Sequence, residues 1–140
     1  PMGYLTNIQH KAKKYCEEHG AHLIPFGGDH PIIIQAMCEV AKSLDVQPKE
    51  VWTVMSSGVL SRGLQMAWPD AKIFGVQIGH NTTEDEMGRA KTFRSKYKFQ
   101  QECKKDELPP FPSSLTYDSK AWTFIKEKAT KGALFWNVGK

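Results

Sequence analysis

The stretch from residue 51 to residue 79 constrains the fold of this chain more than any other. It reads VWTVMSSGVLSRGLQMAWPDAKIFGVQIG and contains two apolar runs, 51–55 and 72–79. The first run has no polar–apolar alternation, which is typical of a parallel strand buried on both faces. Between the runs, residues 61–68 have the spacing of a helix that ends at Pro69 and Asp70. The stretch therefore predicts a strand–helix–strand unit with a right-handed crossover.

The remaining pattern extends this unit in both directions. Apolar residues at a spacing near 3.6 predict helices over 5–18 and 31–44, and a further helix is expected over 118–131. The short apolar segments HLIPF (22–26) and ALFWNVG (133–139) are interpreted as strands. Strands that alternate with helices indicate an α/β fold with three layers, in which a parallel sheet carries helices on both faces.

The composition fits a single domain that spans residues 1–140. Hydrophobic residues make up 40% and charged residues 24%, and the net charge of +4 suits an anionic ligand without identifying a nucleic-acid-binding protein. No apolar run reaches the ~20 residues that a membrane span needs, and no segment resembles a signal peptide. The expected location is cytoplasmic, without a membrane partner. A homodimer is one arrangement compatible with the sequence.

The cysteines Cys16, Cys38 and Cys103 are odd in number and widely spaced. Neither a disulfide framework nor a metal site is expected, because no cysteine or histidine has the spacing of a ligand set. Buried free thiols in a reducing compartment are the favoured interpretation. The start Pro1-Met2-Gly3 runs almost directly into a helical pattern, which suggests a part of a longer protein.

The turn Ser56-Ser57-Gly58 has two interpretations. A buried strand, small residues and a helix N-terminus bring backbone N–H groups together, and such a turn binds phosphate without charged side chains. Ser61 and Arg62 are placed to add a hydroxyl and a charge, and ligands of open α/β sheets bind at the carboxyl ends of strands. The same residues suit a plain connection in which Gly58 adopts a positive φ. The residues alone leave both interpretations open.

Four segments in register resemble the second half of fold-type II pyridoxal-phosphate (PLP) enzymes. HLIPFGGDHP resembles the family's IPxGG element, and MSSGVLSRG lies where the family has a GSGGT-like phosphate loop. TYDSKAW resembles the segment Y-[ET]-G-K-[AS], and ALFWNVG resembles the closing strand vLFxHTGG. The resemblance, which runs from about Gly20 onward, is strongest to D-cysteine desulfhydrase and 1-aminocyclopropane-1-carboxylate deaminase. It implies a tryptophan synthase β-like fold and a PLP-dependent lyase or deaminase that acts on a small amino acid.

The family's phosphate loop falls on five consecutive residues of this sequence, which are Ser56, Ser57, Gly58, Val59 and Leu60. This loop has fewer glycines than is usual in the family, because Val59 and Leu60 stand where small residues are common. The resemblance therefore implies a phosphate site of looser or altered form.

The resemblance also assigns roles to Tyr117 and Asp118. Tyr117 falls where the deaminase branch places a tyrosine near the substrate, which makes it the candidate catalytic residue. Asp118 falls where that branch places a glutamate against the pyridine nitrogen. A carboxylate there keeps the nitrogen protonated and strengthens the ring as an electron sink. The pair equally suits the start of a helix, with Asp118 adding charge to its first turn.

The Schiff-base lysine of the family has no counterpart in this sequence. It lies in the first half of those enzymes, and nothing before His22 resembles its surroundings. Lys11, Lys13 and Lys14 lie on the polar face of a predicted helix and are interpreted as surface lysines. Without this lysine the chain is expected to be inactive alone. Either the missing half lies upstream, or the chain is a reduced, non-catalytic relative.

Parts of the sequence also suit three functions other than that of a PLP enzyme. A non-catalytic α/β module would keep the phosphate or ligand site alone. A phosphoribosyltransferase-like protein is suggested by SSGVLSRGL, although the acidic pair and TGxT-type loop of that family are absent. The basic segment 89–105 interleaves Phe93, Tyr97 and Phe99 and would suit nucleic-acid binding. It is more typical of an element with one solvated basic face, so a nucleic-acid partner is not expected.

The residues next to the ends of predicted strands are further candidates for ligand contacts or helix caps. Asp29 and His30 follow a predicted strand end, where they would face a ligand or cap the next helix, and capping is favoured. His80 follows another strand end and is equally ambiguous. Thr83 with Glu86 three residues later predicts a capping box for a short helix.

Overall fold

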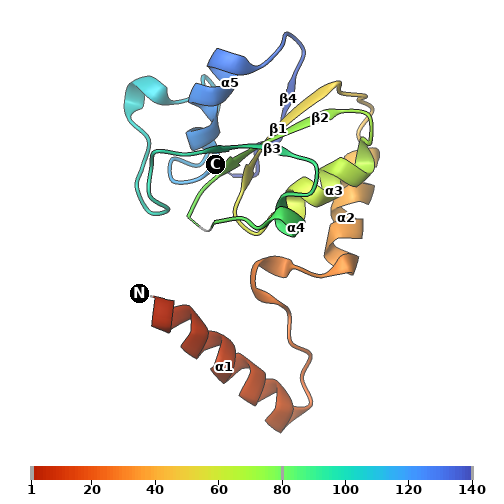
Figure 1. Cartoon of the computed structure of the whole chain (residues 1–140), viewed down its shortest axis with the longest axis vertical. Helices are drawn as coiled ribbons and strands as arrows, with labels where there is room; N and C mark the ends of the chain where they lie inside the picture. Colours follow the sequence, from red (N-terminus) through yellow and green to blue (C-terminus); the bar gives the residue numbers. More distant parts are fainter. Residues whose placement is uncertain (1, 80, 140) are drawn as a thin grey trace.

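The computed structural model of the chain describes residues 2–79 and 81–139, with side chains from residue 6 onward. Its centre is a four-stranded parallel sheet in the order β3-β2-β1-β4 (Figure 1). All six residues of the central strand β1 are buried, as expected for a strand with a neighbour on each side and helices on both faces. The strands are β1 (Glu50–Met55), β2 (Lys72–Gln77), β3 (Lys91–Arg94) and β4 (Leu134–Phe135).

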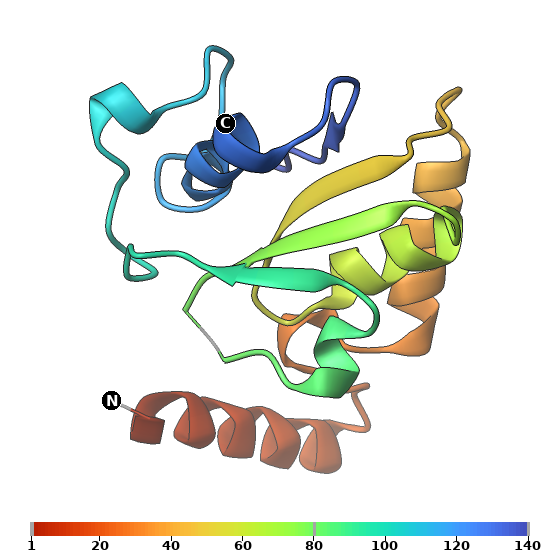
Figure 2. The same cartoon turned by 45° about the horizontal axis from the view of Figure 1, so that its top comes forward.

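Helices cover both faces of the sheet (Figures 1 and 2). On one face Val51 packs with α2 and α3 through residues such as Leu64. On the other face Trp52 packs with the elements that contain Ala121 and Ile125. The predicted α/β fold with three layers is therefore confirmed. The helices of the layers are α2 (Pro31–Lys42), α3 (Val59–Ala67), the 3-10 turn η3 (Asp118–Ala121) and α5 (Trp122–Lys128).

A close approach of α2 and α3 depends on Gly63. A Cβ atom at this position would lie 2.5 Å from Cβ of Met37 on α2. Any larger residue would force the two helices apart, because a packed interior has no free volume to absorb it. Gly63 therefore fixes how α3 sits against α2, and with it where the N-terminus of α3 lies.

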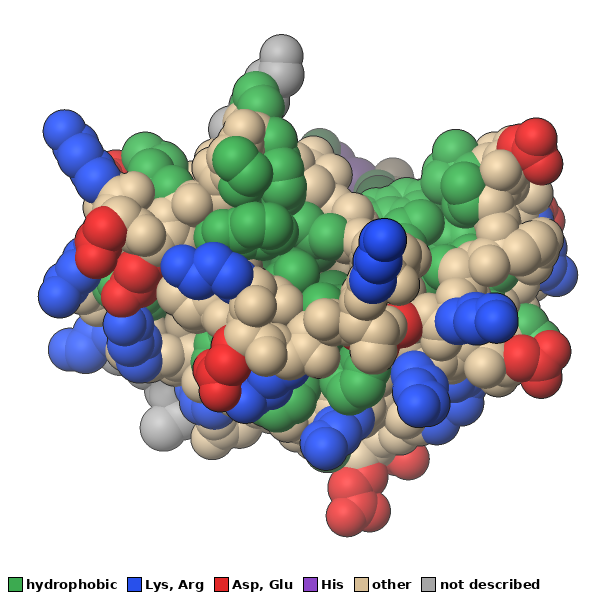
Figure 3. Space-filling model, turned by 90° about the horizontal axis from the view of Figure 1, so that it is seen from above, with side chains coloured by type: hydrophobic (Ala, Val, Ile, Leu, Met, Phe, Trp, Pro, Cys, Tyr) green, Lys and Arg blue, Asp and Glu red, His purple; other side chains and the backbone are tan. Residues whose placement is uncertain are grey.

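The basic segment 89–105 forms part of the fold. Phe93 stacks on Trp52 with ring centroids 5.6 Å apart, and it contacts Phe124 at 5.5 Å. The Arg89 guanidinium donates to the carbonyls of Trp68 and Ala71 at 2.7 and 2.6 Å, just beyond the end of α3. Figure 3 shows lysine and arginine side chains interspersed with acidic ones on the face in view. Arg89 and Phe93 of this segment are thus engaged within the protein.

Most predicted boundaries differ from the observed ones by up to three residues. The helix expected over 61–68 begins at Val59, and the helix expected over 118–131 starts as η3 and ends at Lys128. The last strand is shorter than expected, since only Leu134–Phe135 pair with β1. The capping box is confirmed, with Thr83 N donating to Glu86 Oε2 at 2.7 Å. The remaining short elements are α4 (Glu84–Met87), η1 (Phe26–Gly28) and η2 (Lys105–Glu107).

The strand predicted over 22–26 is wrong. These residues form an extended linker that ends in η1, and Leu23, Ile24 and Phe26 are exposed. A strand needs a hydrogen-bonded neighbour, and among the described residues the sheet contains β1 to β4 without this segment. The apolar side chains of this segment thus do not belong to a paired strand within the described residues.

The N-terminal helix α1 (Met2–His19) stands apart from the sheet (Figure 1). It confirms the helix predicted over 5–18, but none of its side chains from Thr6 to His19 is buried. Ile8 and Tyr15 are 45% and 58% exposed although they lie on the apolar stripe of the helix. An isolated helix of this length has marginal stability in water.

We expect the backbone amides of α1 to exchange with solvent about a thousandfold faster than those of β1, since local opening there breaks few tertiary contacts. Hydrogen–deuterium exchange followed by mass spectrometry measures this difference. The peptide that contains α2 serves as the internal control, because α2 is a helix that packs on α3. Equal protection of α1 and α2 would show that α1 is docked in solution.

The structure also shows how far the cysteines are buried and whether a described helix could span a membrane. Cys38 and Cys103 are buried free thiols, as expected, whereas Cys16 on α1 is only half-buried. Within the described ranges, no helix combines the length and the apolar character needed to cross a bilayer.

Candidate functional site

A cavity of about 230 Å³ opens where β1 ends and α3 begins. This is the carboxyl edge of a parallel sheet, where ligands of open α/β folds bind. All five residues of the predicted phosphate loop line it, and so does Tyr117. The remaining lining residues are Gly27, Ile33, Met37, Val54, Ser61 and Val138.

The loop between β1 and α3 depends on the conformation of Gly58. This glycine has φ +73°, and a Cβ on it would lie 2.0 Å from the carbonyl oxygen of Glu86. The helix then starts at Val59, and no side chain among the described residues caps it. The first N–H groups of α3 therefore remain available to an anion, which the helix dipole also favours.

The hydroxyl of Ser57 connects the two glycine-bearing turns of the site. Ser57 Oγ donates to the carbonyl of Gly27 at 3.1 Å, and a Cβ on Gly27 would lie 2.6 Å from Cβ of Ser57. The IPFGG turn thus packs directly on the phosphate loop. Ser61 is buried, and its hydroxyl accepts a hydrogen bond from Gln65 Nε2 at 3.1 Å. Both hydroxyls already have partners in the protein.

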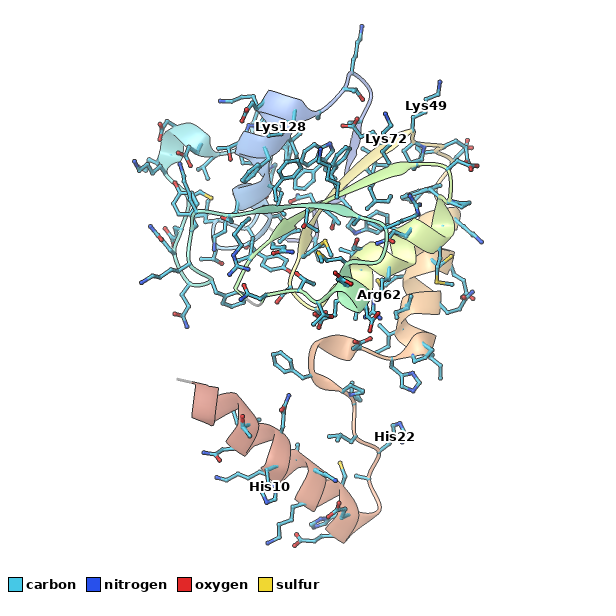
Figure 4. The ribbon with its side chains drawn as sticks, in the orientation of Figure 1. His10, His22, Lys49, Arg62, Lys72 and Lys128 are labelled. Atoms are coloured by element: carbon cyan, nitrogen blue, oxygen red, sulfur yellow. The ribbon has the colours of Figure 1, made fainter. Side chains whose placement is uncertain are left out.

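Arg62 is engaged by the residue that follows the glycine turn. Its Nη2 lies 2.6 Å from Asp29 Oδ1, and Figure 4 shows Arg62 near the end of α3 that faces this turn. The charge predicted for a phosphate is therefore compensated by a carboxylate. His30 caps α2, since its Nδ1 accepts from Ile32 N at 3.2 Å, which confirms the favoured capping role. His80 lies outside the described residues.

Tyr117 presents a protonated phenol to the cavity at neutral pH. Burial raises the pKa of Tyr117 to about 12, and the charge of the adjacent Asp118 acts in the same direction. Phe99 packs edge-on to its ring, with centroids 6.3 Å apart. A phenol in this state donates a hydrogen bond or supplies a proton, rather than acting as a base.

Asp118 is buried beside Tyr117 but is not part of the cavity lining. It is 1% exposed, and its Oδ2 accepts from Gly139 N at 3.0 Å. Its Oδ1 has no hydrogen-bond partner among the described atoms. Burial raises the pKa of this carboxyl, and the backbone N–H groups of Val138 and Gly139 partly oppose that shift. Asp118 is thus a buried carboxylate with unused acceptor capacity.

The structure brings the loop residues and Tyr117 to one cavity, and it adds residues that sequence reasoning missed. Gly27 carries a signal in the sequence, because a glycine pair at a strand-like segment often marks a close approach of backbones. Ile33 and Met37 of α2 carry no such signal, since they are ordinary members of an apolar helix stripe.

The described residues offer neither a metal site nor a lysine at this cavity. No group of three or more His, Cys, Asp or Glu side chains is arranged to hold a metal ion in the ranges that the structure covers. Among the described residues that line the cavity, none is a lysine. Lys11, Lys13 and Lys14 are exposed on α1, where Lys14 pairs with Glu18 at 3.6 Å.

Comparisons with known proteins identify a shared fold. No family model matches the chain, and no curated protein matches it in sequence. A solved structure described as the ACC deaminase homologue superposes with a TM-score of 0.69 at 17% sequence identity. The superposition covers 96% of this chain and 54% of the other, so the chain spans about half the length of that protein. The chain therefore has the fold found in that part of the ACC deaminase homologue.

Proposed function

We propose that this chain binds pyridoxal phosphate in the cavity between the Ser56–Leu60 loop and Tyr117. It would form part of a fold-type II lyase or deaminase that acts on a small amino acid. The observation that carries the proposal is the meeting of an uncapped helix N-terminus and a half-buried tyrosine at one cavity. The fold shared with an ACC deaminase homologue supports it, because that enzyme class is the one the sequence motifs resemble.

The residues that line the cavity fit the phosphate end of the cofactor. The phosphate suits the N–H groups that follow Gly58, since no side chain of the described residues occupies them. The family resemblance assigns the pyridine nitrogen to Asp118, whose buried Oδ1 lacks a partner among the described atoms. Asp118 is 1% exposed and does not line the cavity, so this assignment rests on the resemblance alone. When bound, the cofactor supplies the electron sink for the reaction at the substrate's α-carbon.

This chain's own residues would bind and orient rather than provide the covalent attachment. The loop would hold the phosphate, and Tyr117 would keep a proton on its hydroxyl near the substrate. The role that the resemblance gives Asp118 at the ring nitrogen would require this carboxylate to reach a cavity that it does not line. No lysine is among the described residues that line the cavity, so the Schiff-base lysine would come from another part of a longer protein or from a second chain.

The absence of a lysine from the described cavity lining also favours a second candidate function. A non-catalytic module of the same fold would bind a phosphate-bearing ligand at the same loop. Both functions require the phosphate site. They differ in whether a lysine reacts with the cofactor aldehyde in the protein that contains this chain. Reduction with borohydride and peptide mapping of the longer protein would separate them.

The phosphate site is tested with pyridoxine 5′-phosphate and pyridoxine, which lack the aldehyde and cannot react with surface lysines. We expect isothermal titration calorimetry to give at least about tenfold tighter binding of the phosphate-bearing compound, because charge-assisted hydrogen bonds to the loop are lost without it. Ser56→Asp adds a negative charge at the cavity and should abolish this preference. Gln47→Glu adds the same charge on an exposed loop and should preserve the preference. Equal binding of the two compounds, or binding of neither, would refute the proposal.

A further inference from the structure

Lys120 is one of the most deeply buried side chains of the protein. It is 2% exposed, and burial lowers the pKa of its ammonium group. Its Nζ donates to the backbone carbonyls of Lys98 and Phe99 at 2.7 and 2.8 Å. A buried ammonium is costly unless hydrogen bonds compensate it. The compensation here comes from two consecutive carbonyls, both on the loop that follows β3.

The loop held by Lys120 carries a ring that contacts the candidate site. The Phe99 ring meets that of Tyr117 edge-on, at 70° between the planes. On another side it lies against Gly79, where a Cβ would be 3.0 Å from Cδ2 of Phe99. Gly79 also has φ +74°, so both its conformation and this contact favour glycine. Phe99 is thus placed between the end of β2 and the tyrosine of the cavity.

Lys120 and Tyr117 belong to the same turn of backbone. Lys120 N donates to the carbonyl of Tyr117 at 3.1 Å, so the two residues move together. Two further hydrogen bonds of the loop, between Lys98 and Gln101, lie within the loop itself. The ammonium of Lys120 therefore ties the loop to the segment that carries Tyr117.

We propose that Lys120 is a positioning residue for the cavity. By holding the carbonyls of Lys98 and Phe99, it keeps the Phe99 ring against Tyr117 and so fixes the orientation of the phenol. The role of this orientation in binding the pyridine ring rests on the proposed function. The geometric part, from Lys120 through Phe99 to Tyr117, does not depend on any ligand.

The geometric part is tested first, on the chain without ligand, by NMR with the variant Lys120→Met. Methionine keeps the aliphatic volume and removes the donors. The Lys98 carbonyl keeps its hydrogen bond from Gln101 N, and the Phe99 carbonyl can turn to solvent, so the fold should survive. We expect the nuclear Overhauser effects between the rings of Phe99 and Tyr117 to disappear. Those between the stacked rings of Trp52 and Phe74, 4.6 Å apart, should remain as evidence of an intact core. Persistence of the Phe99–Tyr117 effects would overturn the proposal.

The binding part compares pyridoxine 5′-phosphate with inorganic phosphate. Lys120→Met should weaken the affinity for pyridoxine 5′-phosphate by about tenfold, which is the order of one aromatic contact. The affinity for inorganic phosphate should change by less than about twofold. Phe99→Leu keeps the Lys120 hydrogen bonds, because their acceptors are backbone atoms, and should give the same pattern. Equal weakening of both ligands would overturn the positioning role in favour of a general structural one. If wild-type protein binds neither ligand, the proposed function fails, whereas the NMR result still decides the geometric part.

Discussion

Replacing Gly58 by alanine is expected to lower the free energy of unfolding by about 3 kcal/mol, as the sum of a left-handed backbone cost and an overpacking cost. The backbone cost follows from φ +73°, and the overpacking follows from the 2.0 Å approach of a Cβ to the Glu86 carbonyl oxygen. That oxygen belongs to the backbone of α4, so it cannot move aside as a flexible side chain would. Urea unfolding monitored by tryptophan fluorescence measures the effect.

Gly132→Ala is the matched control for this prediction. Gly132 has φ +84°, and a Cβ on it would meet no atom within 4 Å. Its replacement should therefore cost only the backbone contribution, about 1 kcal/mol. The difference between the two variants isolates the contact between the phosphate loop and α4. An equal loss of unfolding free energy in both variants would show that the α4 backbone does not contact the loop at Gly58.

Removal of the buried carboxylate by Glu50→Ala is expected to destabilise the protein by about 3 kcal/mol, because buried donors lose a charged acceptor. Glu50 is 5% exposed and accepts from Trp52 Nε1 at 2.6 Å. It also accepts from the backbone N and the hydroxyl of Thr130, at 3.0 and 2.8 Å. These bonds join β1 to the end of α5 across 80 residues of sequence. Urea unfolding of Glu50→Ala measures the loss. The exposed Glu39→Ala serves as control and should change stability by less than about 0.5 kcal/mol.

The same carboxylate gives a pH dependence of defined sign. Burial alone would raise the pKa of Glu50, but the hydrogen bonds from Trp52 and Thr130 and the charge of Lys72 outweigh it and hold the pKa below its ordinary value of 4.5. A lowered folded-state pKa contributes stability above the unfolded-state pKa, and that contribution is lost as the pH falls through the folded-state value. Wild-type protein should therefore lose stability below about pH 4.5 more steeply than Glu50→Gln. Parallel pH profiles of the two proteins would contradict this assignment.

The parts of the fold that follow from local periodicity could be predicted from the sequence. The apolar run of β1 and the helical spacing of α3 identify their elements to within about two residues, because buried strands and amphipathic helices have distinct periods. The capping box at Thr83 and the cap at His30 are likewise local in sequence. The predicted parallel α/β sheet follows from the order of these elements.

The parts that depend on distant contacts could not be predicted. The segment HLIPF has strand composition but no neighbour to pair with among the described residues, and composition does not report the missing partner. Lys120 would ordinarily be assigned to the surface, since buried lysines are rare without compensation. Its compensation comes from carbonyls 21 and 22 residues away, which no spacing rule locates.

Some residues of the candidate site could be predicted from the local sequence, and others could not. The five loop residues are consecutive, so a turn at a strand end predicts their common placement. Tyr117 joins them only through the fold, and its role near a substrate stays a prediction. Ile33 and Met37 complete the wall through helix packing, which depends on the close approach at Gly63. Binding of the cofactor at this site remains our proposal.

The central claim, that the cavity at the end of β1 binds the phosphate of a pyridoxal-type ligand, is tested most directly by amide chemical shifts. We would titrate ¹⁵N-labelled chain with pyridoxine 5′-phosphate and record each backbone N–H. Our account predicts that the largest shifts occur at residues 57–61 and at Tyr117, where the helix N-terminus and the cavity meet. Shifts confined to the exposed lysines of α1, or no saturable shifts at 57–61, would contradict it.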